Sequence, residues 1–158
     1  MENQNIAAIK KDLSYLSKEE LVAHILKLAK YKKENKELLS YLLFYSENEQ
    51  HYIESVIEEM DGMFSEINST NVYYVKKSVR KILRFCAKQI KFSGKKETEV
   101  EILAHFCQKM KKFNLKSERN LVLQNIYDRQ LIKIHKALST LHEDVQFDYQ
   151  EKVRGLGR

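Results

Sequence analysis

The stretch VKKSVRKILRFCAKQIK, residues 75–91, carries seven Lys or Arg residues and no acid. Its apolar residues recur at intervals of three and four, which is the spacing of a helix that buries one face. On an ideal helix all seven charges fall within an arc of about 140°. The seven are Lys76, Lys77, Arg80, Lys81, Arg84, Lys88 and Lys91. We therefore predict one amphipathic helix over roughly residues 71–92, with a broad cationic face.

The remaining surface of this predicted helix indicates that it touches two neighbours. An aliphatic stripe covers an arc of about 100° away from the charges. Its members are Val75, Val79, Ile82, Leu83, Cys86 and Ile90. Tyr74, Phe85 and Phe92 form an aromatic stripe between the other two faces. We expect the aliphatic stripe to face the core and the aromatic stripe to face a second helix.

The composition of the whole chain favours an all-α fold. The chain has 158 residues, of which none is Pro and four are Gly. Turns depend on these two residue types, so their scarcity predicts long helices and few loops. We expect five or six helices, arranged as an antiparallel bundle or a short superhelical stack. No linker rich in Pro, Gly or Ser interrupts the sequence, so residues 1–158 should form a single domain, with a frayed tail from about residue 146.

Local signals place most of these helices. Ser17 and Glu20 form a capping box, which starts one long helix or two abutting ones. A short helix containing Ile6, Ile9 and Leu13 precedes it. Gly94 should end the basic helix, because Gly readily takes the left-handed conformation after a helix. Two further helices are expected over residues 97–113 and 118–145, with Ser117 capping the second.

An acidic segment precedes the basic helix. Residues 47–67 contain seven acids and no Lys or Arg, whereas residues 68–96 contain nine Lys or Arg and no acid. The four-residue turn NSTN (68–71) should fold these segments into an antiparallel hairpin. The candidate charge partners on the acidic segment are Glu54, Glu58, Glu59, Asp61 and Glu66. Most of these acids lie opposite their own apolar stripe, so part of the cationic face should stay free for an anionic partner.

Residues that could carry chemistry are few. Of the five histidines, His135 and His142 are expected on one face of a helix, but no further ligands appear at metal-binding spacing. Glu101 and His105 are four residues apart and could pair on a helix surface. Cys86 and Cys107 lie on apolar stripes, so we expect buried, unreactive thiols. The sequence predicts no catalytic residue, no metal site and no cofactor.

The N-terminal pattern is similar to that of a known group of proteins. Residues 10–43 resemble the opening of an uncharacterised bacterial family, known as a domain of unknown function, and its layout extends over about two thirds of the chain. The motif here comprises Leu13, Leu16, Ser17, Lys18, Glu19, Glu20 and Leu21. The resemblance implies an all-α fold and no assigned activity or functional residues.

These observations favour a non-catalytic helical module that binds a macromolecule or itself. A protein is favoured over nucleic acid as the partner, and a homo-oligomer is left open. The alternative is nucleic-acid binding by the basic face of helix 71–92, where evenly spaced cations would meet phosphates and aromatic side chains could stack on bases. No secretory signal appears, and the longest apolar stretch (38–45) is too short to span a bilayer. We therefore expect a cytoplasmic protein without a membrane partner.

Overall fold

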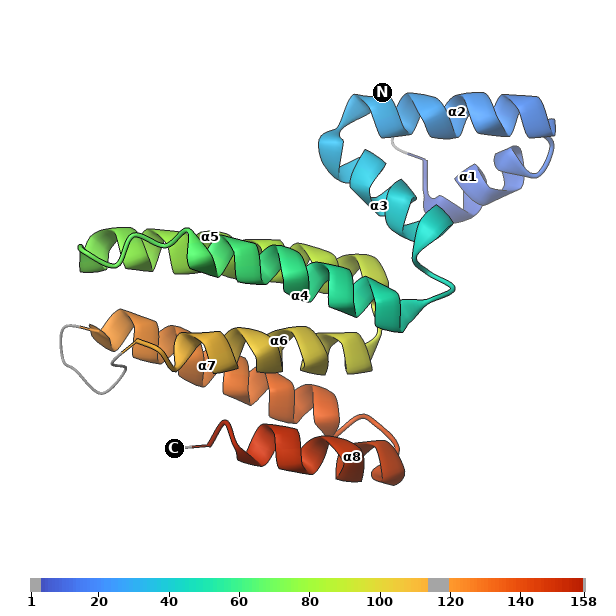
Figure 1. The fold of residues 1–158 in the computed structure, drawn as a ribbon. Coiled ribbons are helices and arrows are strands. Elements are labelled where there is room, and N and C mark those ends of the chain that lie inside the picture. Colours follow the sequence, from blue (N-terminus) through green and yellow to red (C-terminus); the bar gives the residue numbers. More distant parts are fainter. Residues whose placement is uncertain (1–3, 114–119, 158) are drawn as a thin grey trace. The chain divides into compact units, whose positions relative to one another are not determined.

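The computed structural model describes residues 4–113 and 120–157 of the chain. These ranges contain eight helices and no strand (Figure 1), which confirms the all-α prediction and exceeds the five or six helices expected. The helices are α1 (Ile6–Leu13), α2 (Lys18–Tyr31), α3 (Lys33–Phe44), α4 (Glu49–Ser65), α5 (Val72–Ser93), α6 (Lys96–Met110), α7 (Leu121–Leu138) and α8 (Glu143–Arg154). The proposed cap at Ser117 lies outside the described residues.

Side-chain caps set several helix ends. The Ser17 hydroxyl accepts a hydrogen bond from the Glu20 backbone N–H, and the Glu20 carboxylate accepts one from the Ser17 N–H at 2.8 Å, so the predicted capping box is confirmed. Lys32 adopts an extended conformation and separates α2 from α3. The Asn35 amide donates to the Leu28 carbonyl at 2.8 Å across this corner. At the end of α5, Gly94 takes the left-handed conformation (φ 69°) that favours glycine, as predicted.

The chain divides into two compact units, which we describe separately. Unit 1 comprises Met1–Phe44 and unit 2 comprises Tyr45–Arg158. The sequence analysis expected one domain, and no Pro- or Gly-rich linker marks this boundary. In unit 1, α2 packs against α3, and Tyr41 is the one buried residue among its described residues. Unit 2 holds all the other buried apolar residues described.

Contacts between α4 and α5 define a hairpin in unit 2. The Tyr52 hydroxyl of α4 lies 2.7 Å from the Gln89 side-chain oxygen of α5, and the Cys86 thiol lies 3.7 Å from the Met60 sulfur. Residue numbers therefore rise along α4 as they fall along α5, so the two helices run in opposite directions, as the sequence predicted.

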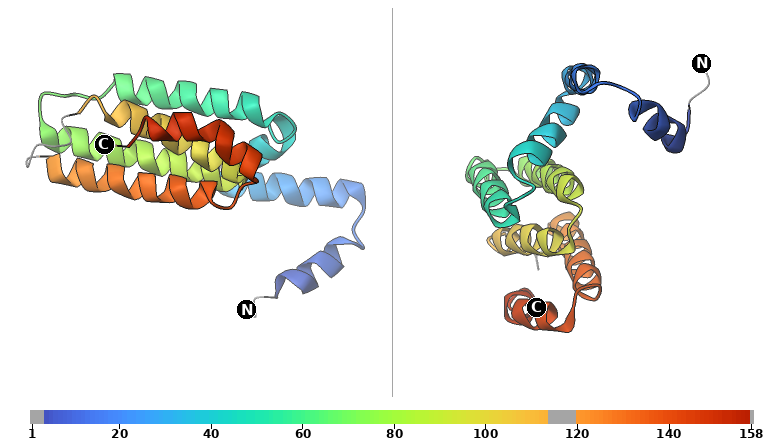
Figure 2. Two further views of the ribbon diagram at one scale, coloured as in Figure 1. Left: turned by 90° about the horizontal axis from the view of Figure 1, so that it is seen from below. Right: turned by 90° about the vertical axis from the view of Figure 1, so that its right-hand side faces the viewer.

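Helix α6 is the central helix of unit 2. It packs against α4, α5 and α7, and the end-on view in Figure 2 (right) shows it among them. Its buried residues lie around most of its circumference: Thr98, Val100, Ile102, Leu103, Ala104, Phe106, Cys107 and Met110. The sequence predicts an apolar stripe through Cys107 on this helix, which is narrower than the buried surface. The difference arises because helices pack on several sides of α6, so its short polar Thr98 is also buried.

The C-terminal part of the chain differs from the prediction. Helix α7 ends at Leu138, and a second helix, α8, replaces the frayed tail expected from residue 146. The tail is held because Val153 and Leu156 are buried and the Tyr127 hydroxyl donates to the Leu156 carbonyl at 2.6 Å. His142 accepts from the backbone N–H of Asp144 and so caps α8, which removes it from the helix that carries His135.

Candidate interaction surfaces

The cationic face of α5 is largely uncovered. Within residues 4–113 and 120–157, six of its seven cations form no side-chain hydrogen bond or ion pair. The six are Lys76, Lys77, Arg80, Lys81, Arg84 and Lys91. Of these, all but the partly buried Lys76 are exposed, and the seventh cation, Lys88, is partly buried and has a partner. The stretch therefore presents a run of solvated positive charges.

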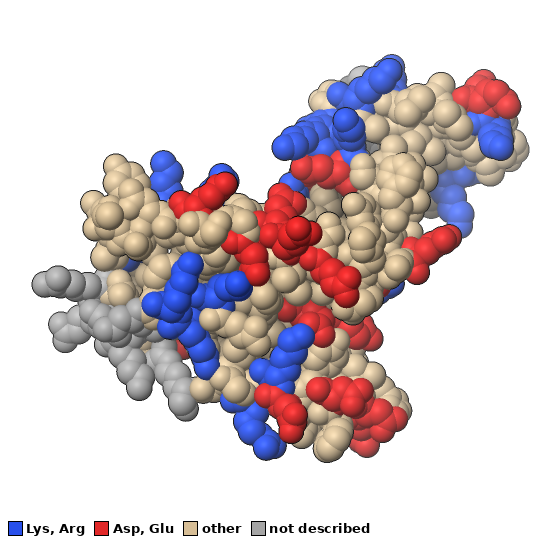
Figure 3. Space-filling view, in the orientation of Figure 1, with Lys and Arg blue, Asp and Glu red and all other residues tan. Residues whose placement is uncertain are grey.

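Of the five candidate charge partners, Asp61 meets α6 instead of α5. Asp61 accepts from His105 at 2.6 Å and pairs with Lys109 at 2.9 Å, and both partners lie on α6. Glu54 accepts from Gln50 of its own helix at 2.9 Å. Glu58, Glu59 and Glu66 form no ion pair with the described residues. Figure 3 shows acidic side chains gathered along α4, with basic side chains beside them on the α6 side.

The structure therefore does not bring the five candidate charge partners to the cationic face. Helices α4 and α5 pack through apolar residues such as Met60 and Cys86, and the five candidate acids lie outside this contact. Two opposing influences act on the pKa of Asp61: burial raises it, and hydrogen bonds from His105 and Lys109 lower it. The hydrogen bonds prevail, so its pKa lies below the ordinary value of 3.8.

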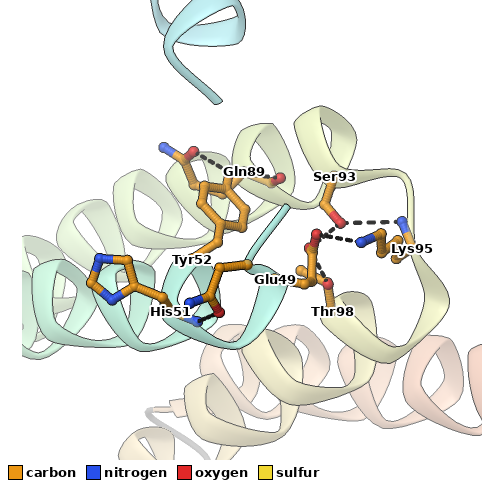
Figure 4. A network of polar contacts seen from close by, with 8 residues as sticks. Glu49, His51, Tyr52, Gln89, Ser93, Lys95 and Thr98 are labelled. Atoms are coloured by element: carbon orange, nitrogen blue, oxygen red, sulfur yellow. Dashed lines mark hydrogen bonds and ion pairs between the residues drawn. The ribbon is translucent and has the colours of Figure 1, made fainter. Parts of the chain in front are cut away.

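Glu49 forms a polar network that the sequence analysis did not identify (Figure 4). Its carboxylate accepts hydrogen bonds from the hydroxyls of Ser93 and Thr98, the latter at 2.6 Å, and pairs with Lys95 at 2.9 Å. The side chain is only 16% exposed. The network ties the start of α4 to the corner between α5 and α6. A spacing rule could not reveal it, because Glu49 and Thr98 are 49 residues apart.

A second long-range pair replaces the expected contact between Glu101 and His105. Glu101 of α6 pairs with Lys152 of α8, while His105 bonds to Asp61. Tyr149 of α8 also lies beside Glu101, and burial together with this carboxylate raises the pKa of Tyr149 to about 12. The contacts of Glu101 attach α8 to α6. Glu101 and His105, which were expected to pair with each other, each bind a different residue.

The histidines and cysteines do not form a reactive cluster. Among the described residues, no group of three His, Cys, Asp or Glu side chains could hold a metal ion. Cys86 and Cys107 are buried free thiols. Burial raises the pKa of each thiol to about 12, and the neighbouring Cys107 adds to the effect on Cys86. Both are therefore protonated near neutral pH and poorly nucleophilic.

Unit 1 exposes a broad apolar surface. We define the unit 1 apolar face by six of the large apolar side chains of α2 and α3 that remain exposed. They are Val22, Ile25, Leu26, Leu28, Leu38 and Leu42. A hollow of about 420 Å³ lies between the two helices, with Ile25 and Leu39 among its lining residues. The sequence pattern had indicated apolar helices here but could not show that so little covers them.

No protein-family model, curated protein or solved structure matches this chain. The resemblance to an uncharacterised bacterial family therefore stays a prediction. In the described ranges, no helix has both the length and the apolar character needed to cross a bilayer.

Proposed function

We propose that this protein is a non-catalytic helical module that binds a protein partner through the unit 1 apolar face. One observation carries the proposal: the described part of unit 1 buries Tyr41 alone, while large apolar residues of α2 and α3 remain exposed. Within this proposal, unit 2 is an antiparallel stack of helices that carries unit 1, in a reducing cytoplasmic setting suited to the free thiols Cys86 and Cys107.

The physical reason lies in the size of unit 1. A segment of about 40 residues rarely buries enough surface to be stable alone and usually needs oligomerisation or another support. Soluble monomers also rarely expose a contiguous apolar patch larger than a few hundred Å². Covering the apolar face with a partner surface would remove both problems, because apolar area withdrawn from water stabilises the complex.

A matched pair of substitutions tests the proposal. Leu26 is 49% exposed on the apolar face, and the exposed Lys27 lies opposite the middle of the apolar arc of α2 on an ideal helix. Leu26→Asp should abolish retention of the partner on purification from the native host, whereas Lys27→Gln, which has the same change of net charge, should retain it. Circular dichroism of both variants controls for loss of helix. If wild type and both variants retain the same proteins, the proposal is wrong.

Nucleic-acid binding by α5 is a second candidate, favoured by its six unpaired cations. From Lys77 to Lys91 the exposed charges extend over about 21 Å of helix, which is enough to contact several phosphates. The affinity should then fall steeply with salt, with a slope of about −0.9 per phosphate contacted on duplex DNA.

Fluorescence anisotropy with labelled single-stranded and duplex oligonucleotides would measure this affinity. The double variant Arg80→Glu and Arg84→Glu should lose binding. The double variant Lys10→Glu and Lys11→Glu, which has the same change of net charge on α1, should retain most of it. Absence of binding by the wild type at low salt would exclude this candidate.

A further inference from the structure

We propose that the partner of unit 1 is a second copy of this chain, with two α2 helices paired antiparallel about a two-fold axis. The inference rests on the proposed function, and it names what covers Val22 and Leu26 of the apolar face. A two-fold interface uses the same patch on both subunits, so that patch must be complementary to itself. Helix α2 meets this requirement in both its apolar and its charged residues.

Four residues of α2 follow one line along the helix. Glu19, Val22, Leu26 and Lys30 are separated by three, four and four residues, which is the spacing of neighbours on one helical edge. All four are exposed. Within the described residues, neither Glu19 nor Lys30 forms a side-chain hydrogen bond or ion pair. The line therefore reads acid, apolar, apolar, base, with both charges unpaired.

This order becomes complementary to itself when the helix direction is reversed. In an antiparallel pair centred near Ile25, Glu19 of one copy lies at the level of Lys30 of the other, and the same contact repeats on the far side of the axis. Val22 then meets Leu26, and Leu26 meets Val22. A parallel pair would instead place Glu19 beside Glu19 and Lys30 beside Lys30, and like charges at one level are unfavourable.

Unit 2 offers a poorer match to this line. Its exposed large apolar side chains, among the described residues, are scattered over α5, α7 and α8: Val72, Tyr73, Tyr74, Leu121, Ile132 and Phe147. Lines with an acid at one end and a base at the other do occur on α7 (Asp128, Ile132, Lys136) and on α8 (Glu143, Phe147, Arg154), but each has one exposed large apolar residue where the line on α2 has two. Charge complementarity therefore favours a second copy as the occupant.

The test is the mass of the full chain in solution. Sedimentation velocity should show a species of about twice 18.8 kDa that dissociates on dilution, since a contact built on one helix pair is small. Leu26→Asp should be monomeric, and Lys27→Gln should dimerise like the wild type. A wild type that stays monomeric at every concentration, or a dimer that Leu26→Asp leaves intact, overturns the inference.

Charge exchange tests the antiparallel pairing directly. Glu19→Lys and Lys30→Glu should each weaken self-association about tenfold, because each reversal creates two like-charge contacts per dimer. An equimolar mixture of the two variants should recover association, since each Lys then faces a Glu of the other chain. Recovery also shows that both variants are folded. If the mixture associates no better than either variant alone, the pairing is wrong.

These outcomes separate the inference from the proposed function. If the wild type is a monomer and Leu26→Asp abolishes the retention of a different protein, the second copy is refuted as the partner. The proposed function then still holds. A monomer in which α2 is protected from hydrogen exchange, and loses that protection in Leu26→Asp, would show that its own chain covers the face. That result would refute both.

Discussion

The ion-pair partners of Asp61 are set by the side chains that surround it in the fold and not by the charge pattern of its own helix. It is 39% exposed, yet it bonds to His105 at 2.6 Å and to Lys109 at 2.9 Å. Its lowered pKa means that the folded state binds a proton at Asp61 less readily than the unfolded state does. Its contribution to stability is therefore present above the ordinary pKa of 3.8 and is lost as the pH falls through the lowered value.

We expect Asp61→Asn to lower the free energy of unfolding by less than about 1 kcal/mol near pH 6, because the pair is partly exposed to water. The gap between wild type and variant should narrow as the pH falls below 3.8. Urea unfolding across this pH range measures it. Glu58→Gln is the control, since Glu58 has no ion partner among the described residues. A gap that stays constant down to pH 3 would contradict this account.

The two cysteines give a second prediction at this scale. Both thiols are buried, and their pKa values are raised to about 12, so neither supplies an accessible thiolate at pH 8. Iodoacetamide should modify neither residue in the native protein and both in 6 M guanidinium chloride. Mass spectrometry of the intact chain counts the modifications. Rapid labelling of Cys86 or Cys107 under native conditions would show that its helix opens readily.

Single helices could be predicted well from their own sequences. The basic helix, its end at Gly94 and the capping box at Ser17 follow from local rules, and the structure agrees with each. Which side chains of neighbouring helices pair could not be predicted. A helical projection shows which face of α4 is acidic, but only the tertiary arrangement brings His105 and Lys109 to Asp61. The buried circumference of α6 is a consequence of the same arrangement.

Charge reversal on the exposed face of α5 should have little effect on stability. Arg84 is exposed and has no ion partner among the described residues, so Arg84→Glu should change the stability by less than about 0.5 kcal/mol. Lys109→Glu should destabilise more, because it removes a partner of Asp61 and introduces a like charge there. Urea unfolding compares the two.

If Arg84→Glu lowered stability and Glu58→Lys in the same chain restored it, α4 and α5 would be paired by charge in solution. Additive effects of the two substitutions would instead agree with the structure, because residues without a shared contact act independently.

At the scale of the whole molecule, burial is distributed very unevenly. Apart from Tyr41, every buried apolar residue described belongs to unit 2, and this core extends to the C-terminal end of the described chain. Sequence reasoning missed both facts. Residues 38–45 are apolar enough to suggest a core helix, whereas two glycines near the C-terminus suggest a loose tail. Hydrophobicity alone does not show which apolar residues are covered.

The C-terminal tail offers a direct test of where the folded core ends. Leu156 is 1% exposed, and its carbonyl accepts from the buried Tyr127 hydroxyl, whereas Phe147 of α8 is 72% exposed. We expect Leu156→Ala to lower the free energy of unfolding by about 2–4 kcal/mol, because it leaves a cavity beside Tyr127. Phe147→Ala removes a larger side chain but should change stability by less than about 0.5 kcal/mol. Chemical denaturation of both variants measures the difference, and a tail that frays in solution would give two equally small effects.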